Sequence, residues 1–317
     1  MPLDASAQAG GDPLDHRRHL TRRLALACAG LMLATIVLSA FMRLSQSGLG
    51  CEGWPDCYAQ ALQAGRPDVG GHGVVLARLL HRIVASAVLV LVMVLVAATL
   101  FTRPRLGREG ALSLTLLLLA LALAALGVVT RGATLPAVVL GNLLGGFLML
   151  ALCGRLAAVA GGKADSPPVL ARWARLGLLL LLGQAALGAM VGASQAALAC
   201  SGWSDCFAAA RSVGWDWQHL NPWQAPGPDA AAPGHPRGVW LQLLHRTWAL
   251  TLMPVLALVA LYAHRHGQRS TSLALVVLLA LQLLLGGLLA PAGLPLVQVL
   301  LHNLTAALVL TLLARLA

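Results

Sequence analysis

Long runs of apolar residues, separated by short polar segments, dominate the pattern along this chain. Eight of the runs are long enough to cross about 30 Å of hydrocarbon as a helix, which takes about 20 residues. Within a bilayer each run must be helical, because an isolated strand would leave backbone groups unpaired in lipid. The predicted spans are residues 24–42, 75–101, 111–130, 136–160, 174–194, 239–263, 271–290 and 295–316. The pattern therefore predicts an all-α integral membrane protein with eight transmembrane helices.

The composition supports a membrane location. Of the 317 residues, 58% are hydrophobic and only 10% are charged, whereas a soluble domain carries about 25% charged residues. A water-exposed globular surface is therefore excluded. The net charge of +11 does not indicate a nucleic-acid partner, because the basic residues are divided among short loops and form no continuous basic face.

The distribution of Arg and Lys predicts the orientation in the membrane. The N-terminal segment, every second loop and the C-terminus are rich in Arg and Lys. The other loops are longer and carry fewer basic residues, together with six acidic residues. Basic loops stay preferentially on the cytoplasmic side. Both termini are therefore predicted to be cytoplasmic.

The chain contains an internal repeat. The segment Cys-Glu-Gly-Trp-Pro-Asp-Cys at 51–57 matches Cys-Ser-Gly-Trp-Ser-Asp-Cys at 200–206 in five of seven positions. Leu-Leu-His-Arg follows each copy, at 79–82 and at 243–246. An even number of spans per unit gives both copies the same orientation. The sequence therefore predicts two tandem four-helix bundles.

The repeat and the orientation together divide the chain into four parts. Residues 1–23 are interpreted as a cytoplasmic tail, and residues 161–173 as a cytoplasmic linker. The N-terminal four-helix half covers residues 24–160, and the C-terminal half covers residues 174–317.

Each repeat carries two cysteines in a loop that is predicted to lie outside the cytoplasm, where disulfides persist. The pairs are Cys51 with Cys57 and Cys200 with Cys206. Five intervening residues allow the two Cα atoms to reach bridging distance. A structural disulfide is the favoured interpretation. A redox-active pair or a metal site are the alternatives, although the spacing is not the Cys-x2-Cys of zinc sites.

Three of the ten histidines lie inside predicted spans, where a titratable side chain is typical of a functional site. They are His81, His245 and His302, and each lies roughly 10 Å inside the outer end of its helix at 1.5 Å per residue. Two imidazoles from neighbouring helices at one depth can take both axial positions of a haem iron within a four-helix unit. Hydrogen bonding between helices is the alternative. Three histidines at one depth favour metal binding.

Arg82 and Arg246 directly follow two of these histidines. One helix step of about 100° turns them away from the direction of the imidazole. Two interpretations stay open, contact with haem propionates and extension of the side chain to the outer interface. An aromatic belt at that interface is predicted around the second outer loop, from Trp203, Trp215, Trp217, Trp223 and Trp240.

The stretch Arg-Leu-Ser-Gln-Ser-Gly-Leu-Gly-Cys-Glu-Gly-Trp-Pro-Asp-Cys at 43–57, followed by the two His-Arg pairs, resembles the haem A synthase family. The resemblance spans the whole chain, with eight helices, two halves and cysteine pairs in matching outer loops. It implies oxidation of the methyl group on ring carbon C8 of haem O to a formyl group, which gives haem A for terminal oxidases. It also implies a haem b cofactor in the C-terminal half, a substrate site in the N-terminal half, and molecular oxygen as the oxygen source or oxidant.

Carried over by resemblance, His245 and His302 match the ligands of haem b, and His81 matches a catalytic histidine of the substrate half. Two positions depart from the family. Gly141 stands where the partner of His81 is expected, and Arg78 stands where the family commonly has a glutamate. An iron held by His81 alone would be five-coordinate, with one face open beside the glycine. The alternative function is a non-catalytic haem-binding paralogue that carries or presents haem during oxidase assembly.

The resemblance also implies a cellular context. The expected location is a bacterial-type inner membrane, with the haem sites toward the extracytoplasmic side. The expected partners are haem O, an electron donor of unknown identity, and haem O synthase or oxidase-assembly factors, while a homo-oligomer stays open.

Overall fold

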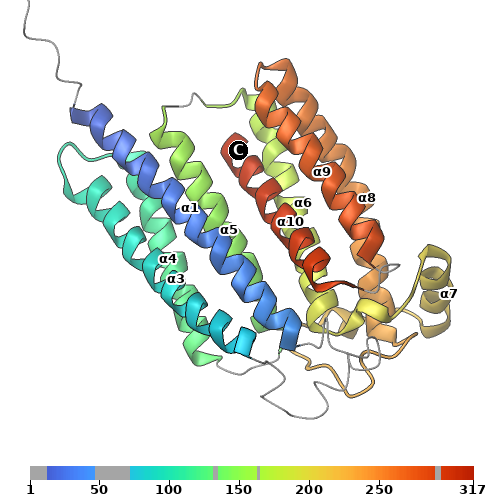
Figure 1. The fold of residues 1–317 in the computed structure, drawn as a ribbon. Coiled ribbons are helices and arrows are strands. Elements are labelled where there is room, and N and C mark those ends of the chain that lie inside the picture. The colour runs from blue at the N-terminus through green and yellow to red at the C-terminus, as the bar shows by residue number, and fades with distance from the viewer. Residues whose placement is uncertain (1–12, 47–71, 131–134, 163–164, 290–293) are drawn as a thin grey trace, which may run out of the picture.

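The computed structural model describes residues 13–46, 72–130, 135–162, 165–289 and 294–317. All regular secondary structure in these ranges is helical, and eight helices are long and apolar enough to cross a membrane. The eight predicted spans are thus confirmed (Figure 1). They are α1 (Pro13–Gln46), α3 (His72–Val96), α4 (Gly107–Val129), α5 (Pro136–Ala160), α6 (Pro168–Ala193), α8 (Pro236–Arg265), α9 (Arg269–Leu289) and α10 (Leu296–Leu316).

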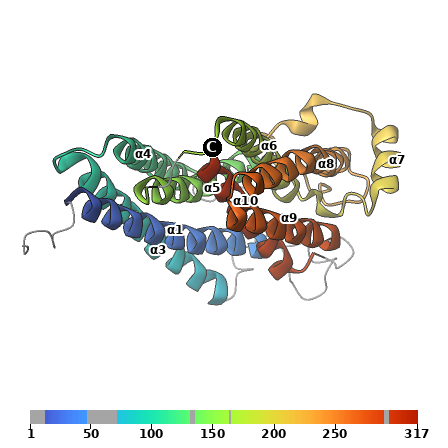
Figure 2. The same cartoon turned by 90° about the horizontal axis from the view of Figure 1, so that it is seen from above.

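Shorter helical segments extend or connect these spans. A π-helical turn at Ala97–Phe101 continues α3. The loop between α6 and α8 contains the helix α7 (Trp203–Val213), flanked by 3-10 turns at Ala196–Leu198 and Trp217–Leu220. This loop is folded, and α7 lies at one margin of the molecule in both views (Figures 1 and 2).

Helix α1 begins at Pro13, so residues 13–23 of the predicted tail form its first turns. Polar contacts with the end of α3 and the start of α4 hold these turns. Arg17 donates to the carbonyl oxygen of Ala98 at 2.9 Å and to that of Pro104 at 2.7 Å. Arg18 forms an ion pair with Glu109 at 3.6 Å. These partners lie far away in the sequence, which explains why the apolar pattern alone placed the start of the helix later.

The two halves are four-helix bundles with the same arrangement. In the N-terminal half, α1 packs against α3 and α5, and α4 packs against the same two helices. In the C-terminal half, α6 packs against α8 and α10, and α9 packs against the same two. Helices α3 and α5 therefore occupy diagonal corners of the first bundle, and α8 and α10 occupy diagonal corners of the second. A side chain on a diagonal helix can point at the bundle axis.

Helix α5 joins the two bundles, because it also packs against α6 and α10 (Figure 2). In the most apolar 18-residue stretch of α5, 50% of the residues are buried, compared with 11–28% in the equivalent stretches of the other spans. The contact with α10 is close, since a Cβ at Gly154 would lie 2.5 Å from Cγ2 of Thr311. Small residues commonly permit such approaches between membrane helices.

The start of α1 and the end of α10 lie on the same side of the molecule, and α7 lies on the opposite side (Figure 1). Large apolar side chains on the outer surface of the bundles are more than half exposed, which suits contact with lipid. Examples are Leu118, Leu179 and Leu284.

Candidate functional site

His245 and His302 lie on the diagonal helices α8 and α10 of the C-terminal bundle. Both side chains are partly buried. The structure therefore brings together, within one bundle, two of the three histidines that the sequence placed at one depth.

The ring of His245 packs against α6. The side-chain amide nitrogen of Gln184 lies 3.2 Å from Nδ1 of His245 and 3.4 Å from its Nε2. One turn further along α6, a Cβ at Gly188 would lie 3.0 Å from Cε1 of the same ring. The edge of the His245 imidazole that carries both nitrogens thus faces the side-chain amide of Gln184 and the backbone of α6 at Gly188, which has no side chain there.

The ring of His302 packs against α9 in the same way. The amide nitrogen of Gln282 lies 3.1 Å from Nε2, and a Cβ at Gly286 would lie 3.0 Å from Cε1. The hydroxyl of Thr305, on α10, donates to the amide oxygen of Gln282. The Nδ1 atom of His302 is buried and has no hydrogen-bond partner among the described residues.

The hydrogen bonds indicate the protonation state of the rings. An amide nitrogen can only donate, so the ring nitrogen that faces it accepts through a lone pair. A neutral imidazole with a lone pair directed out of the ring is the form that ligates a metal. The two rings are therefore neutral nitrogen bases, and a metal that binds the accepting nitrogen would replace the amide there.

The loop next to this site carries a disulfide. Cys200 and Cys206 are bonded, with their Cα atoms 5.2 Å apart, which confirms the predicted disulfide in the second repeat. Cys51 and Cys57, the predicted pair in the first repeat, lie outside the described residues. The other two cysteines, Cys28 and Cys153, are free and buried.

Arg246 connects the bridged loop to α8. Its guanidinium donates to Sγ of Cys206 at 3.3 Å and to the carbonyl oxygen of Cys200 at 3.4 Å. These contacts anchor the turn of α8 that follows His245 to the loop. The sequence suggested two other roles for Arg246, contact with propionates and extension to the outer interface, and did not suggest this one. Arg82, its counterpart in the first repeat, is exposed.

Asp205 closes the same loop. Its carboxylate accepts from the backbone N–H of Ser201 at 2.7 Å and from the Ser201 hydroxyl at 3.0 Å. These hydrogen bonds stabilise the ionised form and lower the pKa of Asp205 below its usual value. The loop geometry thus depends on a charged Asp205.

The tryptophans pack mainly around the 3-10 turn beyond α7. Trp215 makes edge-to-face contacts with Trp217 at 5.2 Å and with Trp240 at 4.9 Å between ring centroids. Trp217 and Trp223 are 75% and 71% exposed, as an interfacial belt requires.

In the N-terminal bundle, the diagonal helix α5 offers no partner histidine to His81. His81 lies partly buried on α3, and the diagonal helix α5, whose residues are all described, contains no histidine. A Cβ at Gly141 would lie 3.0 Å from Cδ2 of Leu126, and one at Gly145 would lie 2.4 Å from Cδ2 of Leu123. Leucines of α4 thus fill the contact with α5. Arg78 is exposed.

Sequence reasoning missed four residues that contact the histidine pair. They are Gln184, Gly188, Gln282 and Gly286. A signal was available, because glutamine is rare in apolar spans and each of these two is followed four residues later by glycine.

The fold and this site together define a duplicated eight-helix membrane protein with a histidine pair inside its second bundle. Residues 73–314 match the COX15-CtaA family, which is described as cytochrome oxidase assembly protein. The chain belongs to this family. It is also similar to the Heme A synthase of Shewanella oneidensis, with 31% identity in an alignment of 307 residues that covers 88% of this chain and 90% of the relative.

Proposed function

We propose that this protein is a haem A synthase, which oxidises the C8 methyl group of haem O to the formyl group of haem A. The observation that carries the proposal is the 31% identity to a Heme A synthase over nearly the full length of both chains. The histidine pair supports it, because oxidation of a methyl group requires a path for electrons, and a haem with two axial histidines is suited to electron transfer.

His245 and His302 are the residues that would hold a haem b. The residues present fit this group in two respects. A buried ring nitrogen of His302 and the buried amide oxygen of Gln184 have no partner among the described residues. The two rings are also carried by diagonal helices of one bundle, so both could contribute to holding one group between the helices. When bound, haem b would supply one-electron transfer.

The protein's own residues hold this site in place. Gln184 and Gln282 direct the rings, and the contacts of Arg246 fix the outer end of α8 to the disulfide loop. Hydrogen bonds in a low-polarity environment are stronger than in water.

The N-terminal bundle is the proposed substrate site, with His81 as the histidine that holds the iron of haem O. Gly141 on the diagonal helix α5 offers no ligand, so His81 would hold the substrate without a partner histidine from α5. The exposed guanidinium groups of Arg78 and Arg82 are suited to the propionates of the substrate, since Arg binds carboxylates in bidentate geometry.

The proposed orientation places both termini in the cytoplasm and both haem sites toward the outer side of a bacterial-type inner membrane. The common side of the start of α1 and the end of α10, with α7 and its loop on the opposite side, supports it. An electron donor and a source of haem O, such as a haem O synthase, are the partners that this reaction needs.

The test is expression in a host that supplies haem O and cannot make haem A, followed by chromatography of the extracted haems. The proposal predicts haem A, loss of haem A in His81→Ala, and loss of bound haem b in His245→Ala. A folded protein that carries haem b and haem O without forming haem A would refute the synthase and indicate a haem-binding paralogue.

A further inference from the structure

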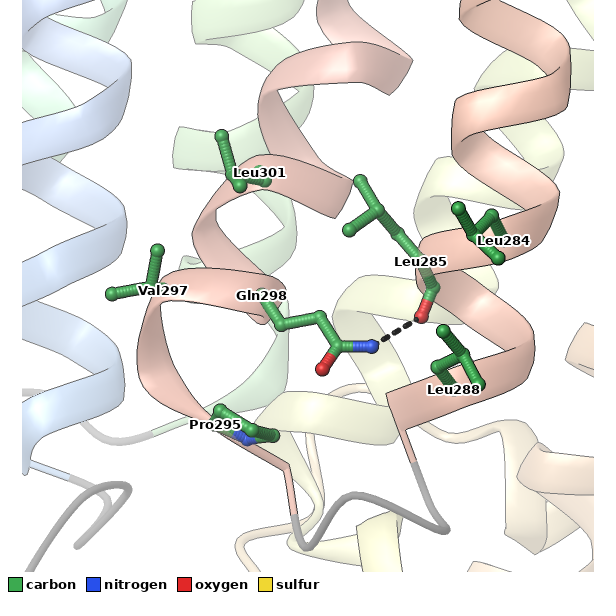
Figure 3. A pocket seen from close by; sticks show the side chains of 7 residues that line it. All are labelled: Leu284, Leu285, Leu288, Pro295, Val297, Gln298 and Leu301. Atoms are coloured by element: carbon green, nitrogen blue, oxygen red, sulfur yellow. Dashed lines mark hydrogen bonds between the residues drawn. The ribbon is translucent and has the colours of Figure 1, made fainter.

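Two features of the molecule lie outside the proposed haem sites. One is an apolar groove of about 550 Å³ between α9 and α10 (Figure 3). Gln298 supplies the side-chain amide in its lining, and this amide already donates to the carbonyl oxygen of Leu285 at 3.0 Å, so the groove offers mainly apolar contact. The other feature is a group of four buried sulfur-containing side chains on α1 and α5, which the proposed reaction does not use.

This group contains two cysteines and two methionines at equal spacing. Cys28 and Met32 are four residues apart on α1, and Met149 and Cys153 are four residues apart on α5. Residues i and i+4 lie on the same face of a helix. Each helix thus presents one thiol and one thioether on one face, one turn apart.

Contacts of two glycines of α5 fix the register between the helices. A Cβ at Gly146 would lie 3.6 Å from Cγ1 of Ile36, and a Cβ at Gly161 would lie 3.3 Å from Cδ of Arg22. The residue numbers rise along α5 while they fall along α1, so the two helices are antiparallel. A step toward the end of α5 is therefore matched by a step toward the start of α1.

This register brings like side chains together. Counted from the first of these contacts, Met149 is three residues along α5 and Met32 is four residues back along α1. Cys153 is seven residues along, and Cys28 is eight residues back. Each pair thus agrees in height to within one residue, or about 1.5 Å. The two thiols also interact with each other, and all four side chains belong to one buried core.

We propose that these four residues form a binding site for a soft monovalent metal ion, Cu(I). Thiolate and thioether sulfur are the ligands that select Cu(I) among biological metals. Cys28 and Cys153 bind the ion as thiolates, and Met32 and Met149 supply thioether sulfur from the next turn. Packing alone would be served by leucine, valine or alanine, which fill most other positions of this core. The proposal does not depend on the proposed haem chemistry.

The charges around the thiols suit such a site. Binding releases one proton from each thiol to water, so two thiolates and one Cu(I) carry one net negative charge. Cys153 lies seven residues before the end of α5, about 10 Å along the axis. Its neighbour Gly154 has the side chain of Arg315 beside it, with Cδ 3.8 Å from the position of a Cβ, and Arg155 donates to the carbonyl oxygen of Arg315 at 3.0 Å. Nearby basic groups favour a thiolate over a thiol.

The test uses the full-length protein in detergent, with ascorbate to keep copper reduced while the Cys200–Cys206 bridge stays closed. Cu(I) is supplied as its bicinchoninate complex, whose absorbance falls as the protein takes up the metal. Wild type should take up one tightly held Cu(I) per chain. Cys28→Ser and Cys153→Ser should each weaken binding on the order of 100-fold, because a four-ligand site draws a comparable share of its binding free energy from each ligand.

A methionine elsewhere in the chain supplies the matched control. Met149→Leu keeps the volume of the side chain and removes the thioether, so it should weaken copper binding with little effect on stability. Met190 on α6 is also buried, and the residues that form its core contain no cysteine. Met190→Leu should therefore retain the copper affinity of wild type. X-ray absorption of the copper-loaded wild type should show sulfur neighbours alone, and this measurement does not depend on the folding of any variant.

Wild-type protein that leaves the copper with bicinchoninate would overturn the proposal. Copper uptake that survives both serine substitutions would overturn it too, because the metal would then be bound elsewhere, and nitrogen neighbours in the absorption spectrum would have the same meaning. The proposed function fails separately. A wild type that binds Cu(I) and forms no haem A refutes the synthase activity and leaves the copper site in place.

Discussion

Replacement of Gly286 by alanine tests the geometry of the histidine pair most directly. The added Cβ would lie 3.0 Å from Cε1 and 3.5 Å from Nδ1 of His302. Carbon atoms in contact normally lie about 3.5–4.0 Å apart, so the ring must retreat by roughly 0.5–1 Å. The hydrogen bond of Gln282 to Nε2 opposes that movement.

The expected magnitude follows from the cost of overpacking. Inserting a methyl group into a closely packed site costs about 1–3 kcal/mol, which corresponds to roughly 5- to 150-fold weaker haem binding if the cost falls on the ligated state. Helix propensity acts in the opposite direction, since alanine is favoured over glycine by up to about 1 kcal/mol in a helix. The thermal stability of the haem-free protein should therefore change little while its haem affinity falls.

The assay is titration of haem into the purified haem-free protein, with Gly287→Ala as the control. No described atom lies within 4 Å of a Cβ at Gly287, although it is the adjacent residue of the same helix. Gly188→Ala, with Gly192→Ala as its control, repeats the comparison on α6 for His245. Equal haem affinity in Gly286→Ala and Gly287→Ala would refute the packing of His302 against α9.

Three further outcomes are expected. Cys206→Ser opens the disulfide loop and should lower the free energy of unfolding by about 2–3 kcal/mol, measured as a reduced melting temperature. Asp205 has a lowered pKa, so its stabilising effect is present above the ordinary pKa of an aspartate and is lost as the pH falls through the lowered value. The melting temperatures of wild type and Asp205→Asn should therefore converge in acid, and a constant difference down to pH 2 would contradict this. Gly154→Ala should separate α5 from α10, because the Cβ would lie 2.5 Å from Thr311, and should lower the melting temperature more than Gly146→Ala, whose Cβ would have an ordinary 3.6 Å contact.

The eight spans were predictable because lipid imposes a minimum apolar length that can be counted along the sequence. The start of α1 was not, since Arg17 finds its partners on the distant segment after α3. The two histidines of the C-terminal bundle could be paired from their depth and the repeat. Their partners left only the weak signal of a glutamine followed four residues later by a glycine, and the need for Gly286 exists only once the ring of His302 is placed beside it.

Arg246 illustrates the same limit. The helix geometry correctly turned it away from His245, whereas its partner is a loop whose shape depends on the Cys200–Cys206 bridge and on Asp205. Contacts that depend on loop conformation are not encoded in spacing along a helix. For Arg82 and His81 the assigned roles stay predictions.

The packing of α5 between the bundles has a consequence for the history of the chain. The last helices of the two repeats, α5 and α10, pack against each other, and each also packs against the first helix of the other repeat, α6 and α1 respectively. Reciprocal contacts of this kind are the mark of an isologous interface, in which one surface binds an identical copy of itself. A four-helix ancestor would therefore have been self-complementary and would have assembled as a homodimer. In a single chain the two copies need not be identical, and here α10 carries His302 whereas α5 carries no histidine.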